Sequence, residues 1–325
     1  MTSREKAIAL LGTWSSPPDL PAKVALALAG CFVVLAMFGR GRSLLFGLFE
    51  GDHPEVQRME RRRFLAVLGL IAGLVSIAYI AIYLRGGPRI IDATTYFLQG
   101  RALSHGDLSW TPLDPSASFR GRFLFYRDGG LGGASLGGIF PPGYPLLLAF
   151  GFMLGAPMIV GPLLALGLVV ATYHLARTLA EDTLPELAAF LSLLCAALRY
   201  HTADTMSHGA AALGITLALT CAVRARRAQQ TRMRLGSLER AAASEQSEGR
   251  GEALLAGLAV GYVVATRPAS ALPIALVVGW LLAPVVLPTG RRSRLLVLVL
   301  AGALPGLFLL ILSQRAVTGS WLEST

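Results

Sequence analysis

The sequence predicts an all-α fold, a polytopic bundle of transmembrane helices with a large outer loop that carries interfacial helices. Three observations predict it. Of the 325 residues, 54% are hydrophobic and only 15% are charged, whereas roughly a quarter are charged in a soluble domain. The mean hydropathy is +0.59. Several apolar runs reach the roughly 18–20 residues that a helix needs to cross a bilayer.

These apolar runs divide the chain into about eight to nine membrane segments. They lie near 22–38, 64–84, 143–155, 157–180, 185–200, 207–223, 253–266, 269–287 and 295–312. Residues 1–63 are expected to form an N-terminal tail, an extra membrane segment and a basic loop. Residues 64–325 are expected to form one transmembrane domain.

The net charge of +10 comes mainly from arginines that stand between the apolar runs. The clusters are "RRR" (61–63), "RARR" (224–227) and "RRSR" (291–294). Such clusters mark cytoplasmic loops, so 39–63 and 224–252 are expected inside and the loop 85–142 outside. The charge is not interleaved with aromatic residues, which argues against a nucleic-acid partner.

The sequence does not determine how many times residues 143–223 cross the membrane. An odd number of crossings must separate the outer loop 85–142 from the inner loop 224–252, yet four apolar segments lie between them. Either the 13-residue segment 143–155 is re-entrant or fused to the next helix, or the positive-inside signal fails once.

Asp92 is the most informative residue of the outer loop, since it begins "DATTYFLQGRALSHGDL" directly after an apolar segment. The apolar positions Ala93, Tyr96 and Phe97 have the spacing of a helix that lies on a membrane surface. One interpretation is a carboxylate that accepts a proton from a nucleophile. The other is an N-cap of that helix.

Two further stretches of the outer loop predict local structure. "FPPGYP" (140–145) predicts a rigid start to the following apolar segment, with Tyr144 in the interfacial aromatic belt. "DGGLGGASLGG" (128–138) lacks the Gly-Lys-Ser/Thr ending of a phosphate-binding loop, so a flexible loop tip is expected.

A second polar stretch, "RYHTADTMSH" (199–208), separates two apolar segments. It holds His201, Asp204 and His208, which suit a metal or a phosphate as well as simple contact with water. Arg267 interrupts another apolar run, where it either reaches to water or pairs with a lipid phosphate.

The order of several motifs resembles the N-terminal membrane half of the GT-C fold glycosyltransferases, over roughly residues 64–325. The matching stretches are "DATTYFLQGRALSHGDL", "GRFL", "FPPGYPLLLAFGFMLG", "YHLARTLA", "SHGAAALGITLAL", "ATRPASALPIAL" and "VTGSW". This superfamily includes the dolichyl-phosphate-mannose–protein mannosyltransferases and the bacterial mannosyl-, arabinosyl- and aminoarabinose-transferase-like membrane proteins.

The resemblance implies an inverting transfer of a sugar from a polyprenyl-phosphate donor to an acceptor, on the extracytoplasmic face of a bacterial cell membrane. Asp92 matches the family's essential acid and is expected to act as the general base. Residues expected to bind the substrate or the donor phosphate are Arg122, Tyr144, His201, Asp204, His208 and Arg267. Where the family often has a second acid, this chain has Ala93. A divalent metal is therefore possible but not supported, and no other cofactor is indicated.

The chain ends at Thr325, soon after "GSW", where relatives of this family carry further helices. It is therefore expected to be a short member, a fragment or an inactive relative. The alternatives from other classes are a transporter or flippase-like protein and a non-catalytic membrane scaffold. A transporter is expected to show internal repeats and broken helices with charges at mid-membrane.

Overall fold

The computed structural model describes residues 54–111, 123–127, 135–180, 184–234, 249–283 and 292–320. These residues form ten α-helices, a short 3-10 helix and one β-hairpin. The helices are α4 (Pro54–Ile82), α5 (Ile91–Ser104), α7 (Gly143–Met153), η3 (Pro157–Ile159), α8 (Val160–Leu179), α9 (Leu184–Leu194), α10 (Ala196–Ala203), α11 (Ser207–Arg234), α13 (Arg250–Thr266), α14 (Pro268–Leu282) and α15 (Arg292–Thr318). The predicted helical bundle is confirmed in this coarse form.

The described residues contain four helices long and apolar enough to cross a membrane. They are Arg61–Ile82, Pro157–Leu179, Ser207–Thr231 and Leu295–Thr318. Large apolar side chains cover their outer surfaces, as expected of faces that meet lipid. The count of eight to nine segments stays a prediction, and the segment 22–38 lies outside the described residues.

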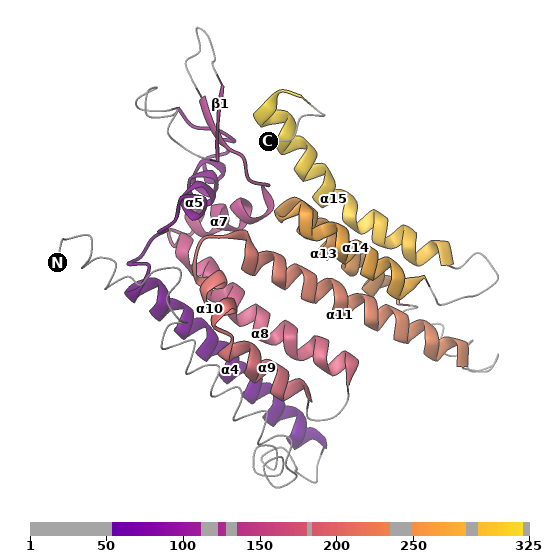
Figure 1. The fold of residues 1–325 in the computed structure, drawn as a ribbon. Coiled ribbons are helices and arrows are strands. Elements are labelled where there is room, and N and C mark those ends of the chain that lie inside the picture. The colour runs from indigo at the N-terminus through magenta and orange to yellow at the C-terminus, as the bar shows by residue number, and fades with distance from the viewer. Residues whose placement is uncertain are drawn as a thin grey trace, which may run out of the picture.

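Helix α7, which lies in the predicted segment 143–155, is too short to cross a membrane by itself. Its 11 residues rise about 16 Å, roughly half of a hydrocarbon core of about 30 Å. Figure 1 shows α7 beside α5 at one end of the bundle, while α8 and α11 run its length. This favours the alternative in which 143–155 does not span, and the number of crossings made by α8, α9, α10 and α11 stays a prediction.

The start of α4 and the end of α11, which carry the arginine clusters 61–63 and 224–227, lie at the opposite end of the bundle (Figure 1), which we call the basic end. The Arg61 guanidinium at the start of α4 lies 3.4 Å from a carboxylate oxygen of Glu186 in α9. The charges of Arg177 in α8 and Arg224 in α11 both act on His174. The predicted inner loops 39–63 and 224–252 both overlap with helices, because α4 already includes Arg61 and α11 continues to Arg234.

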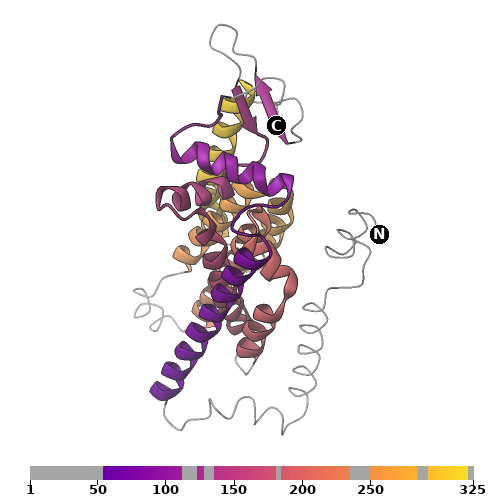
Figure 2. The same cartoon turned by 90° about the vertical axis from the view of Figure 1, so that its left-hand side faces the viewer.

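The other end, which we call the α5 end, carries α5 across the bundle and the hairpin above it (Figure 2). Strand β1 (Leu124–Arg127) pairs antiparallel with β2 (Ser135–Gly138). This hairpin adds two four-residue strands to the helical fold and corrects part of the predicted flexible loop. Gln99 of α5 holds it, since the side-chain amide donates to the carbonyls of Gly138 and Phe140, each at 3.0 Å.

Helices α13 and α15 approach each other through glycines, which we call the glycine seam: Gly257 and Gly261 of α13 with Gly302 and Gly306 of α15. A Cβ added to Gly261 would lie 2.7 Å from the carbonyl oxygen of Ala303. One added to Gly302 would lie 2.8 Å from the amide nitrogen of Leu258. Only glycine permits this contact of backbone with backbone, which is typical of helices that pack within a membrane.

Candidate functional site

Asp92 lies in the first turn of α5 and does not cap it. The helix begins at Ile91, its N-cap is Ile90, and no side chain makes a capping hydrogen bond. The N-cap interpretation of Asp92 is therefore wrong. A carboxylate in the first turn still interacts favourably with the helix dipole. Asp92 is half-buried and keeps part of its surface open to solvent.

Two buried hydrogen bonds join α5 to the turn between α10 and α11. The Thr205 hydroxyl donates to the carbonyl of Ala93 at 2.8 Å. The Tyr96 hydroxyl donates to the Ser207 hydroxyl at 2.9 Å. Because Ala93 follows Asp92 directly, these bonds place the start of α5 beside residues 204–208.

The ring of Tyr96 is fixed by aromatic contacts on the same face of α5. It stacks on Phe140 with centroids 4.1 Å apart and meets Tyr144 edge to face at 5.6 Å. Tyr144 is only 1% exposed and belongs to a core cluster between α5, α7 and α8. Its predicted place in an interfacial aromatic belt is therefore wrong, since the side chain packs inside the bundle.

The α10–α11 turn brings together the two histidines and the aspartate of the sequence stretch 199–208. The imidazoles of His201 and His208 stack with centroids 4.6 Å apart and an interplanar angle of 21°. One carboxylate oxygen of Asp204 accepts the amide of Thr205 at 2.8 Å. The turn is tight because a Cβ on Gly209 would lie 2.8 Å from the His201 carbonyl oxygen.

Three polar atoms of this turn are enclosed without a hydrogen-bond partner in the described part of the chain. They are Nδ1 of His201, Nδ1 of His208 and Oδ2 of Asp204. Buried polar atoms are nearly always hydrogen-bonded, to protein or to water. The turn therefore offers one carboxylate oxygen and two imidazole nitrogens to a molecule from outside the chain.

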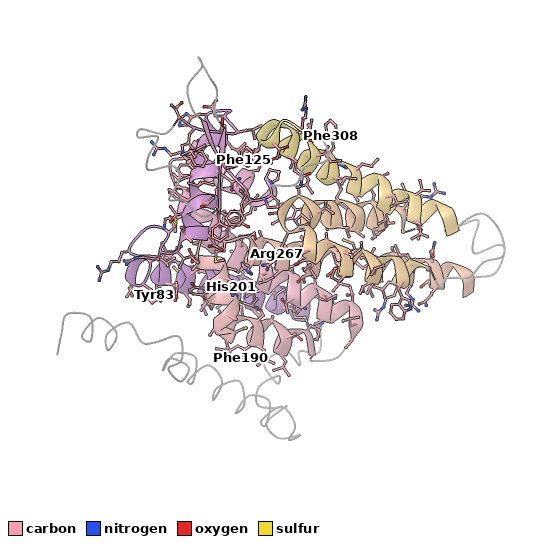
Figure 3. The ribbon with its side chains drawn as sticks, turned by 45° about the horizontal axis from the view of Figure 1, so that its top comes forward. Tyr83, Phe125, Phe190, His201, Arg267 and Phe308 are labelled. Carbon is pink, nitrogen blue, oxygen red and sulfur yellow. The ribbon has the colours of Figure 1, made fainter. Side chains whose placement is uncertain are left out.

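Arg267 joins the same region from α13. It ends α13, where its amide donates to the Val263 carbonyl at 2.7 Å, and its own carbonyl accepts from the first turn of α14. Its charge acts on His201, His208 and Tyr96. Figure 3 labels His201 and Arg267, which lie close together where their two helices end.

Burial sets the electrostatics of Asp204. Removal from water raises the pKa of its carboxyl group. The Thr205 amide, the His201 imidazole and the Tyr200 hydroxyl oppose the rise, and the charge of Asp92 adds to it. Burial also raises the pKa of the Tyr96 hydroxyl. Tyr96 thus keeps its proton and acts as a donor to Ser207, while Asp204 holds a proton more readily than an aspartate in water.

Five polar side chains thus lie at the α5 end, and we call them the polar cluster: Asp92, His201, Asp204, His208 and Arg267. Arg122 lies outside the described residues. Three contributors were not predicted from the sequence, namely Tyr96, Thr205 and Ser207, which hold α5 against the turn. Within the described ranges, no three His, Cys, Asp or Glu side chains stand close enough to hold a metal ion.

Comparisons with protein-family models, with curated proteins and with solved structures found no significant match to this chain.

Proposed function

We propose that this protein is a membrane glycosyltransferase that moves a sugar from a polyprenyl-phosphate donor to an acceptor, with Asp92 as the general base. One observation carries the proposal: three separate parts of an apolar bundle, α5, the α10–α11 turn and the end of α13, bring a carboxylate, two histidines and an arginine together at one end. The GT-C-like order of the sequence motifs supports the same function.

The location suits a lipid-linked donor. The prenyl tail of such a donor stays among the lipid chains, so its phosphate lies where the apolar helices end. The four long apolar helices run between the α5 end and the basic end (Figure 1). At the α5 end, Asp92 and Asp204 lie beside two stacked histidines. A reaction at that phosphate needs acidic and basic side chains at the level where the apolar helices end.

Each residue of the cluster has a definite part in the proposed reaction. Asp92 accepts the proton of the acceptor hydroxyl as that oxygen attacks the anomeric carbon. The bond from the anomeric carbon to the phosphate oxygen breaks in the same step, so the configuration inverts. Arg267 offsets the charge that develops on the leaving phosphate. His201 and His208 beside it donate hydrogen bonds to the same phosphate. Asp204 holds the α10–α11 turn through the Thr205 amide.

The decisive experiment compares Asp92→Asn with wild type. Membrane vesicles that contain each variant receive a polyprenyl-phosphate-linked hexose, and sugar transfer is measured. We expect a loss of about 10²–10⁴-fold in rate, the usual contribution of a general base. Asp107→Asn is the matched control, since Asp107 is an exposed carboxylate just beyond α5, and it should keep the wild-type rate. Transfer by Asp92→Asn at the wild-type rate excludes the catalytic role.

The second candidate function is transport of an anionic substrate, and a specific observation favours it. The pass between α8 and α11 is broken into α9 and α10, and buried Arg199 follows the break. Discontinuous helices with buried charges are typical of substrate sites in transporters. Release of the hexose donor on the far side of the vesicle, without transfer, distinguishes this function from the first.

A further inference from the structure

The helical segment between α8 and α11 is interrupted at a position that has neither glycine nor proline. α9 ends at Leu194, Cys195 is extended with φ −66° and ψ 105°, and α10 begins at Ala196. A break in a helix needs a cause. Here Arg199 supplies a compensating contact, since its Nη2 donates to the Ser192 carbonyl of α9 at 3.3 Å.

The break opens a new helix N-terminus inside the bundle. No side chain caps the start of α10, and the Arg199 amide donates to the carbonyl of its N-cap Cys195 at 3.1 Å. The first amides of a helix have no partner within that helix. Free amides at a helix start carry a partial positive charge and favour an anion.

Arg199 places a full positive charge at the same break. The residue is only 6% exposed, and its Nε and Nη1 have no hydrogen-bond partner within the described part of the chain. Cys195 is the sole titratable group of the described chain whose charge acts on it. A buried charge without a counter-ion is strongly destabilising, and an ionisable side chain inside a membrane usually has a partner.

α4 carries a second buried donor. Ser76 is 0% exposed, and its Oγ is also without a partner in the described residues. The rings of Tyr79 and Tyr200 meet edge to face at 5.9 Å, so α4 and α10 pack together in this part of the bundle. Ser76 precedes Tyr79 by one helical turn, and Arg199 adjoins Tyr200.

We propose that a small monovalent inorganic anion of the halide class binds at the α9–α10 break, held by the Arg199 guanidinium, the first amides of α10 and the Ser76 hydroxyl. All three are donors, and together they carry one full positive charge. A monovalent ion neutralises that charge, whereas a doubly charged phosphate leaves a net negative charge in an apolar bundle. The proposal does not depend on the polar cluster or on sugar transfer.

The test is the thermal unfolding of the purified full chain in detergent, with sodium gluconate replaced by sodium bromide at constant ionic strength. We expect the unfolding temperature to rise by about 5 °C as bromide saturates the site. Arg199→Leu should abolish the rise, because it removes the charge and keeps an apolar side chain. Arg101→Gln is the matched control, since it removes an exposed arginine of α5, and it should keep the rise.

Two results overturn the proposal: wild type shows no bromide-dependent rise, or Arg199→Leu shows the same rise as wild type. Ser76→Ala provides the test if Arg199→Leu does not fold. It removes one neutral hydrogen bond to the anion, so the bromide concentration at half-effect should increase about fivefold. An unchanged midpoint in Ser76→Ala contradicts the assigned site.

Discussion

The polar cluster and the glycine seam are both places where separate helices meet, yet they meet in opposite ways. At the glycine seam, backbone lies directly against backbone between α13 and α15. At the polar cluster, side chains from α5, α10, α11 and α13 converge, and several of their polar atoms have no partner in the described chain. The seam is complete by itself, whereas the cluster needs another molecule.

This difference separates stability from function. In a membrane the lipid is as apolar as the helices, so close packing of small residues holds helices together. Enclosed polar atoms without partners cost free energy. Their retention at one end of the bundle is therefore explained by ligand binding better than by folding. Substitutions in the seam should change the folded fraction, and substitutions in the cluster should change activity with a small effect on stability.

The largest effect on stability is expected at the seam. In Gly306→Val, the added side chain would overlap the backbone of Gly261, so α13 and α15 must separate. We expect a loss of about 3 kcal/mol or more in the free energy of unfolding, measured by thermal unfolding in detergent. Gly279→Val is the control, since nothing lies within 4 Å of a Cβ at Gly279. Equal stability of the two variants would show that the seam does not hold the bundle.

The positions of the helices could largely be predicted from the sequence, because apolar length is a strong signal in a membrane protein. The break at Cys195 could not, since residues 187–198 form an uncharged and mostly apolar run with no glycine or proline. The hairpin was missed for a related reason. Strand β2 is Ser-Leu-Gly-Gly, a poor strand pattern, and it is held by a side chain of α5.

The candidate site shows the same limit. Asp92, His201, Asp204, His208 and Arg267 stand out because charged or polar residues are rare in this chain. The bonds that assemble them do not stand out, since the pairs Tyr96–Ser207 and Thr205–Ala93 are 111 and 112 residues apart. Similarly, the spacing of Gly257 with Gly261 and of Gly302 with Gly306 is visible in the sequence, but their pairing across two helices is not.

An intermediate effect is expected for the bond that joins α5 to α11. Tyr96→Phe and Ser207→Ala should each destabilise the protein by about 1–3 kcal/mol, because each leaves the other hydroxyl buried without its partner. The double variant should cost about 1 kcal/mol less than the sum. The control is Ser104→Ala, which removes only an exposed hydroxyl bond. Additive single effects in the unfolding measurement would show that the two hydroxyls act independently.

The smallest effect on stability is expected at Asp204, and it depends on pH. Because burial raises the pKa of Asp204 in the folded protein, the folded state binds its proton more tightly than the unfolded chain. The resulting stabilisation is fully present below the ordinary value of 3.8 and is lost as the pH rises through the raised folded pKa. Asp204→Asn is permanently neutral and keeps an oxygen that accepts the Thr205 amide.

We therefore expect the unfolding temperature of Asp204→Asn to vary less than that of wild type between about pH 4 and about pH 8. Near pH 8, the unfolding temperature of Asp204→Asn should be higher than that of wild type. Asp107→Asn, which changes an exposed carboxylate, should follow wild type throughout. A wild-type curve that instead gains stability over this range relative to Asp204→Asn would mean that the charged carboxylate has a favourable partner in the folded protein. In that case the polar cluster would be as self-sufficient as the glycine seam, and the argument that it is kept for a ligand would fail.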